Sequence, residues 1–149
     1  MKQIATAFNN GYDHHLIFEG LNESRLLGTQ YEWLYKGGEQ ICKEVAVELN
    51  EYMRLIVKAI RENGGNNAKR FIMITPLAAG YQAAIESIFK FPDDFKYNPF
   101  NSKLILSVHM YSPYKFTLNA DKNYTNFEDS YKTELLESFK TLYTNYVLK

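Results

Sequence analysis

The sequence predicts an α/β fold in which parallel strands alternate with helices. Three short apolar runs, bounded by polar or turn-forming residues, indicate strands at residues 16–21, 71–74 and 104–108. All three runs are continuously apolar rather than alternating, which is typical of strands covered on both faces, as in a parallel sheet with helical crossovers. Segments with helical periodicity separate these strands, so a βα architecture is expected.

The predicted elements follow the order helix, strand, helix, strand, helix, strand, helix. The first helix covers Lys2–Phe8 and ends at an Asn-Asn-Gly turn. The longest helix has apolar residues at helical spacing from Ile41 to Ile60, and Gly64-Gly65 would end it as a left-handed cap. A shorter helix is predicted over Gln82–Phe89. A Tyr/Asn-rich loop then leads to a last helix with apolar residues on one face from Leu135 to Val147.

Length and composition indicate one globular domain. The 149 residues are 46% apolar and 23% charged, an ordinary globular balance. The 17 basic residues equal the 17 acidic ones, which argues against nucleic acid or an anionic membrane as a partner. Cys42 is the only cysteine, so neither an intrachain disulfide nor a cysteine metal site can form. The sequence has no run of 18 apolar residues, and its N-terminus has no apolar signal core.

Candidate reacting groups follow from position, because βα folds carry them at the C-terminal ends of strands. Asn22 and Glu23 follow the first strand, and His109 and Tyr111 follow the third. His109 and Tyr111 are two residues apart, so they point to the same side, and with Glu23 they would form a proton-transfer site. The alternatives are that Glu23 is a solvated loop carboxylate and that His109 and Tyr111 belong to a buried aromatic layer.

Other polar residues are assigned structural roles. His14 and His15 precede the first strand, and as neighbours they are expected to point in opposite directions. No HxH, HExxH, Walker or GxGxxG pattern occurs, so neither a metal nor a nucleotide cofactor is expected. Glu19 shares a face with Glu23 by strand alternation and is predicted to form a structural ion pair.

The segments LIFEGLNE, GGNNAKRFIMI and LILSVHMYSPY, in this order, resemble glycoside hydrolase family 5. The resemblance is strongest to its bacterial and rumen endo-β-1,4-glucanases and extends over essentially all 149 residues. It implies a partial (β/α)8 TIM barrel, about strands 4 to 6 with their helices, as a fragment of one catalytic domain over residues 1–149. The other strands, including the one with the nucleophilic Glu, would lie outside the chain.

The resemblance also implies roles for single residues. Glu23 matches the general acid/base of a retaining hydrolysis, and Asn22 matches its neighbour that contacts the sugar. His109 and Tyr111 match a His-x-Tyr pair that borders the same subsite. The family usually has Pro after the acid/base, where this chain has Ser24, so the loop geometry at Glu23 is left open.

Trp33 is the only tryptophan and lies in the loop after Glu23. It is interpreted as a sugar-stacking platform on the leaving-group side, because aromatic faces suit the apolar faces of glucose rings. The alternative is that it packs the loop onto the barrel.

The sequence therefore predicts an endoglucanase-like hydrolase that acts on β-1,4-linked glucan or a related polysaccharide. It would be secreted or at the cell surface as a full-length protein, which could carry accessory modules. The isolated chain is expected to be inactive, because its nucleophile would lie beyond the C-terminus. The alternative is a non-catalytic partial barrel that binds glucan or assembles with a complementary fragment.

Overall fold

The computed structural model describes residues 1–119 and 125–148 and divides the chain into two compact units. The first unit is Met1–Val108 and the second is His109–Lys149. Residues 120–124, which belong to the predicted Tyr/Asn-rich loop, lie outside the described residues. Within the described part of the chain, no helix is both long enough and apolar enough to cross a membrane.

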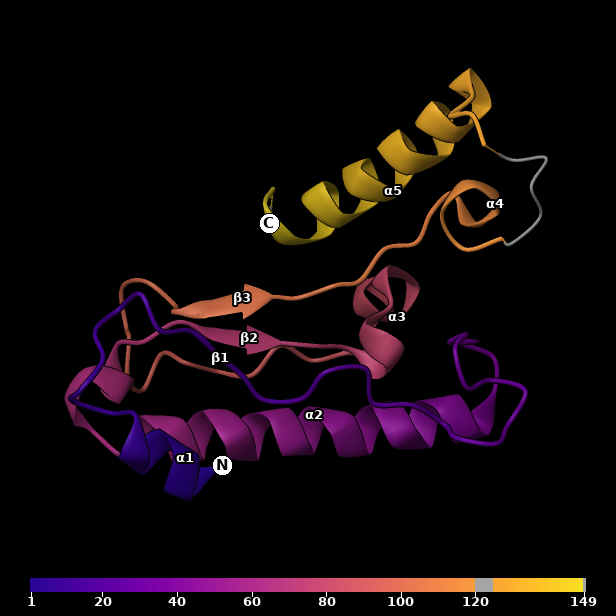
Figure 1. Ribbon diagram of the computed structural model, residues 1–149. Helices are drawn as coiled ribbons and strands as arrows, with labels where there is room; N and C mark the ends of the chain where they lie inside the picture. The colour runs from indigo at the N-terminus through magenta and orange to yellow at the C-terminus, as the bar shows by residue number, and fades with distance from the viewer. Residues whose placement is uncertain (120–124, 149) are drawn as a thin grey trace. The chain divides into compact units, whose positions relative to one another are not determined.

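A three-stranded parallel sheet forms the centre of the first unit (Figure 1). Its strands are β1 (Phe18–Glu19), β2 (Ile72–Ile74) and β3 (Leu104–Leu106), in the order β1-β2-β3. Phe18 pairs with Ile72, and Ile72 pairs with Leu104, all in parallel register. The predicted α/β class, with parallel strands in sequential order, is confirmed.

The first strand is much shorter than the apolar run that predicts it. The carbonyl of Leu16 accepts a hydrogen bond from Arg70 Nη1 at 2.9 Å, and that of Leu21 accepts one from Thr75 Oγ1 at 3.0 Å. Side chains therefore satisfy the backbone at both ends of the run, and ladder pairing is confined to Phe18–Glu19.

The helices of the first unit are α1 (Lys2–Ala7), α2 (Gln40–Arg61) and α3 (Tyr81–Ile85), with 3₁₀ turns η1 (Gly65–Ala68) and η2 (Leu77–Ala79). The α1 and α2 helices lie on the same side of the sheet (Figure 1). The predicted glycine cap of α2 was wrong. The helix ends at Arg61, its C-cap Glu62 keeps a right-handed helical conformation, and Gly64, with φ +66° and ψ −156°, instead precedes the 3₁₀ turn η1.

The helix predicted over Gln82–Phe89 ends at Ile85. The next residue, Glu86, has extended backbone with ψ 140°. Further on, the side chain of Asn50 in α2 donates to Ile88 O at 2.8 Å and accepts from Lys90 N at 3.0 Å. This long-range amide contact holds the segment against α2 in a non-helical conformation.

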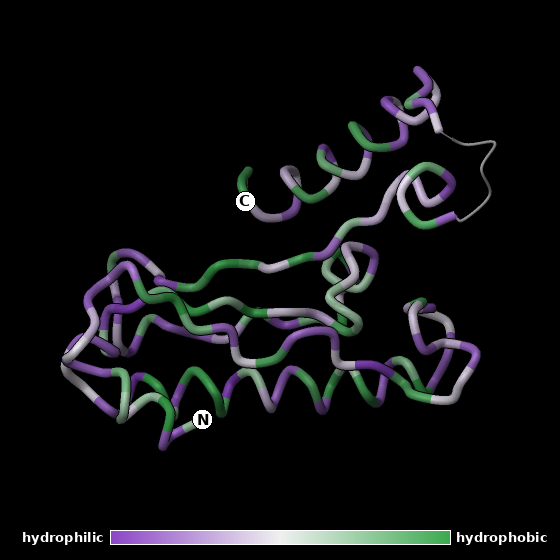
Figure 2. Tube along the Cα trace, viewed as in Figure 1, coloured by the Kyte–Doolittle hydropathy of each residue, from purple (hydrophilic) through white to green (hydrophobic). Residues whose placement is uncertain are grey.

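The hydrophobic core lies between α2 and the sheet. One stripe of α2 is buried against Phe18 of β1 and against Ile72 and Ile74 of β2. The stripe consists of Cys42, Ala46, Leu49, Met53, Val57 and Ile60. Figure 2 shows apolar residues concentrated along the strands and recurring along α2, the pattern that predicted both elements.

The second unit contains α4 (Tyr114–Thr117) and α5 (Asp129–Tyr146). The last helix forms where its periodicity predicts it, but its apolar residues are largely exposed. Leu136, Phe139 and Tyr143 are 57%, 56% and 52% exposed, whereas Tyr131 and Ser138 are the buried residues of α5.

Candidate active site

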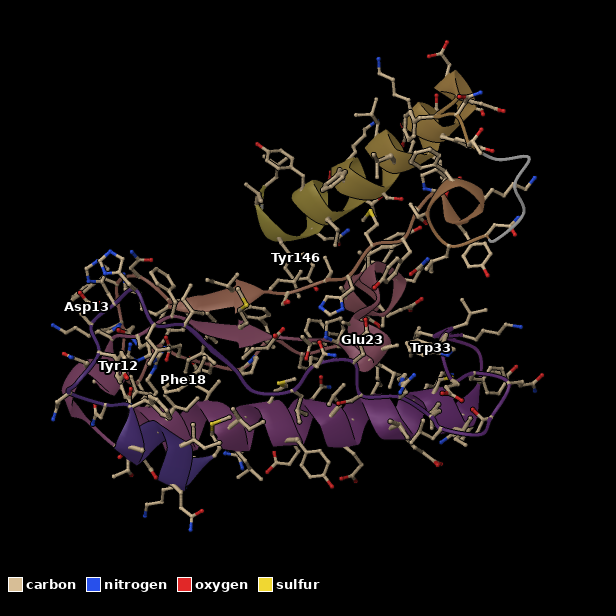
Figure 3. The ribbon with its side chains drawn as sticks, viewed as in Figure 1. Tyr12, Asp13, Phe18, Glu23, Trp33 and Tyr146 are labelled. Carbon is tan, nitrogen blue, oxygen red and sulfur yellow. The ribbon has the colours of Figure 1, made fainter. Side chains whose placement is uncertain are left out.

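The segment that follows β1 carries Asn22 and Glu23 and is held by two hydrogen bonds from the segment that follows β2. Thr75 Oγ1 donates to Leu21 O at 3.0 Å, and the N–H of Ala78 donates to Ser24 O at 2.8 Å. The two bonds flank Glu23, which is partly buried, while Asn22 is exposed. The carboxyl group is thus positioned at the C-terminal end of the sheet (Figure 3).

The backbone after β2 adopts an uncommon conformation to make this contact. Ala78 and Ala79 have φ values of +54° and +49°, in the left-handed region that non-glycine residues rarely occupy. Such residues persist where the surrounding structure holds them, and they concentrate at functional sites. A turn of this kind is usually recognised in a sequence by a glycine, and this one contains alanines. The sequence analysis therefore did not identify Ala78 as a residue that positions Glu23.

Ser24 occupies the position at which the resembled family usually has Pro. Its carbonyl accepts the hydrogen bond from Ala78 at 2.8 Å. A contact from another segment of the chain therefore constrains the backbone directly after Glu23, where a proline ring would constrain it locally.

The predicted ion pair of Glu19 is not found among residues 1–119 and 125–148. Its side chain is exposed, and its Oε1 accepts a 3.0 Å hydrogen bond from Ser107 Oγ, just after β3. The prediction was wrong because it placed the carboxylate inside a closed layer, where only a cation or a proton could compensate the charge. At an exposed position a hydroxyl partner is sufficient.

Trp33 is 61% exposed, so it does not pack the loop onto the sheet. The guanidinium carbon of Arg25 lies 3.9 Å from the centre of the indole ring, over one of its faces. Arg25 Nη1 is 3.4 Å from Glu32 Oε1, and Glu32 Oε2 accepts the N–H of Gly28 at 3.1 Å. Arg25 and Glu32, which the sequence analysis did not single out, thus orient the ring on the loop after Glu23.

His109 and Tyr111 belong to the second unit. His109 is partly buried and Tyr111 is 51% exposed, which disfavours a buried aromatic layer for Tyr111. The Tyr111 carbonyl accepts a 2.6 Å hydrogen bond from Thr117 Oγ1. The convergence of these two side chains with Glu23 stays a prediction.

His14 and His15 lie in a turn before β1, and their expected divergence was wrong. Their ring centres are 4.1 Å apart, and both rings lie beside the Asp13 carboxylate. The alternation of side-chain directions holds for extended strands, and it does not apply to a turn.

Comparison with known proteins identifies the relatives of this chain. The family model described as Cellulase (glycosyl hydrolase family 5) matches residues 1–149. Endoglucanase 1 of Ruminococcus albus is 41% identical over 147 residues, which are 99% of this chain and 32% of that protein.

Solved structures of similar proteins match the fold. A variant of a glycoside hydrolase 5 lichenase from Caldicellulosiruptor sp. F32, in complex with cellotetraose, matches with a TM-score of 0.89 and 30% identity. A broad-specificity endoglucanase from Ruminococcus champanellensis with bound cellotriose matches with a TM-score of 0.82 and 34% identity. The match covers 98% and 99% of this chain but only 40% and 39% of those chains.

Proposed function

The chain belongs to glycosyl hydrolase family 5, and on that premise we propose that it forms part of an endo-β-1,4-glucanase in which Glu23 is the general acid/base. The observation that carries the proposal is the position of Glu23. It follows the C-terminal end of a parallel strand, where barrel enzymes carry their reacting groups, and hydrogen bonds from Thr75 and Ala78 flank it.

In this proposal, β1, β2 and β3 are about strands 4 to 6 of a (β/α)8 barrel. Their parallel pairing in sequential order supports the assignment, because consecutive strands are neighbours in such a barrel. Residues 1–149 would then be a fragment of a single catalytic domain.

The proposed reaction is a retaining hydrolysis with two carboxylates roughly 5–5.5 Å apart. Glu23 protonates the glycosidic oxygen while the second carboxylate attacks the anomeric carbon. Glu23 then acts as a base and activates the water that hydrolyses the glycosyl-enzyme. We propose that the second carboxylate belongs to a part of the barrel that these 149 residues do not include, so that the chain alone is inactive.

Four further residues are proposed to contact the polysaccharide. Asn22 contacts the sugar at the cleavage site, and His109 and Tyr111 border the same subsite. Trp33 stacks on a glucose ring on the leaving-group side. The substrate is a β-1,4-linked glucan or a related polysaccharide, as the cellotriose and cellotetraose bound to similar proteins suggest. The complete protein would act outside the cell or on its surface, where such polymers occur.

A second candidate function is glucan binding without hydrolysis. The exposed indole of Trp33, oriented by Arg25, favours this reading for the chain by itself. Binding of cellotetraose by the isolated chain, without release of reducing sugar, would support it.

The proposal is tested in a chimera in which the 149 residues replace the matching segment of Endoglucanase 1 of Ruminococcus albus. The chimera is expected to hydrolyse carboxymethylcellulose, and the Glu23→Gln variant is expected to lose nearly all of this activity. Glu48→Gln, which removes an exposed carboxylate on α2, is the matched control and should stay active. An active chimera that tolerates Glu23→Gln would contradict the proposal.

A further inference from the structure

Three consecutive residues at the start of the sheet bring three metal-binding groups together. His15 Nδ1 lies 2.9 Å from Asp13 Oδ1, and His14 Nδ1 lies 4.0 Å from Asp13 Oδ2. Each oxygen of one carboxylate thus faces a different imidazole, and one ligand atom from each residue lies within 4.8 Å of the others. Figure 3 shows Asp13 at the end of the first unit that is distant from Glu23.

The backbone around these residues is held by Arg70, whose side chain is buried. Its guanidinium donates to the carbonyls of Asn9 at 2.9 Å, Tyr12 at 2.7 Å and Leu16 at 2.9 Å, and also to that of Asp13. Buried charges of this kind require several hydrogen bonds to offset their desolvation. The turn is therefore fixed on both sides of the histidines, and only exposed side chains must move to bind a ligand.

We propose that Asp13, His14 and His15 bind a divalent transition-metal ion such as Zn²⁺. Ligand distances of roughly 2.0–2.2 Å place two donors on one zinc ion about 3.3 Å apart. The His15 and Asp13 atoms, 2.9 Å apart, lie slightly closer than this spacing and would have to separate. His14, whose Nδ1 is 4.0 Å from the other carboxylate oxygen, would have to approach. Its side chain is 76% exposed, so this movement meets little resistance.

The donor set suits this class of ion. Imidazole nitrogens with one carboxylate favour zinc, copper or nickel over calcium and magnesium. Cys42 is buried in the core and does not compete.

The site is separate from the proposed catalytic residues, so it would act on stability rather than on hydrolysis. An ion that binds the folded turn more tightly than the unfolded chain stabilises the native state by mass action. Within residues 1–119 and 125–148, these three residues form the one such group of histidine and acidic ligands.

Titration calorimetry of the 149-residue chain with Zn²⁺ tests the proposal, because it reports stoichiometry per chain whatever the oligomeric state. One ion per chain is expected. His14→Ala, His15→Ala and Asp13→Asn should each weaken binding at least tenfold, and His109→Ala, which removes the third histidine, should have no effect. Absence of Zn²⁺ binding by the parent chain would overturn the proposal. So would His14→Ala and His15→Ala variants that bind Zn²⁺ as tightly as the parent chain.

A synthetic peptide of residues 9–17 provides the second measurement. It contains the same three ligands but lacks Arg70, so it is expected to bind Zn²⁺ at least tenfold more weakly than the chain. Equal affinity of peptide and chain would show that the fold contributes nothing, which contradicts a site built by the Arg70 contacts.

Discussion

The backbone N–H of Ala78 donates a 2.8 Å hydrogen bond to the carbonyl oxygen of Ser24, the residue directly after Glu23. With the bond from Thr75 to Leu21, it connects the segments that follow two neighbouring strands. The proposed acid/base is therefore positioned by contacts that cross more than 50 residues of sequence, rather than by its own loop alone.

Thr75→Val should loosen this arrangement. Valine keeps the shape of threonine but leaves the Leu21 carbonyl without its donor, which costs about 1–3 kcal/mol where that group is desolvated. In the chimera, urea denaturation should show lower stability, and the kcat on carboxymethylcellulose should fall. Thr75→Ser retains the hydroxyl, so its stability and kcat should lie closer to those of the parent. Equal stability and kcat in the Val and Ser variants would argue against the role of the hydrogen bond.

Arg25→Ala should uncover the second face of Trp33. The guanidinium lies 3.9 Å from the ring centre, a contact worth about 0.5–1 kcal/mol at an exposed site. Because Trp33 is the only tryptophan, acrylamide quenching of the chain's fluorescence reports this ring alone, and quenching should increase in the variant. Arg54→Ala, which removes an exposed arginine paired with Glu51 on α2, is the matched control. Equal quenching in both variants would mean that Arg25 does not cover the ring.

Asp94→Ala should be among the most destabilising single changes. The Asp94 carboxylate forms a fully buried, bidentate pair with Arg61, with N–O distances of 2.7 and 3.1 Å. Removing one partner leaves a buried charge uncompensated, at a cost of about 3–5 kcal/mol. Urea denaturation of the chimera measures this loss, and the double variant Arg61→Met/Asp94→Leu should recover part of it. An Asp94→Ala variant as stable as the parent would show that the buried Arg61–Asp94 pair does not stabilise the fold.

The isolated chain is expected to self-associate. Among the described residues the sheet has three strands, too few to close a barrel, so β1 and β3 are edge strands. Large apolar side chains are also exposed, including Leu136 and Phe139 of α5 and Tyr52 of α2. Size-exclusion chromatography with light scattering should show oligomers. A monodisperse monomer with a cooperative thermal transition and no binding of the dye ANS would refute this expectation.

The sequence predicted those features that depend on the spacing of apolar residues within one segment. The apolar stripe of α2 and the three parallel strands follow from periodicity. Features that depend on hydrogen bonds between residues far apart in the sequence were either missed or predicted wrongly. Asn50 binds the backbone of Ile88 and Lys90, after the end of α3. Ala78 and Thr75 hold the segment of Glu23, and Ser107 pairs with Glu19. In each case a hydrogen bond joins segments whose proximity the sequence does not reveal.

The central claim is that Glu23 donates the proton to the leaving group, and the Glu23→Ala chimera tests it most directly. Its hydrolysis of carboxymethylcellulose, whose leaving group needs a proton, should fall about 10²–10⁴-fold relative to the parent chimera. Its first-step attack on dinitrophenyl β-cellobioside, whose leaving group departs as a stable anion, should fall far less. Comparable losses on both substrates, or no loss on carboxymethylcellulose, would contradict the assignment of Glu23 as the acid/base.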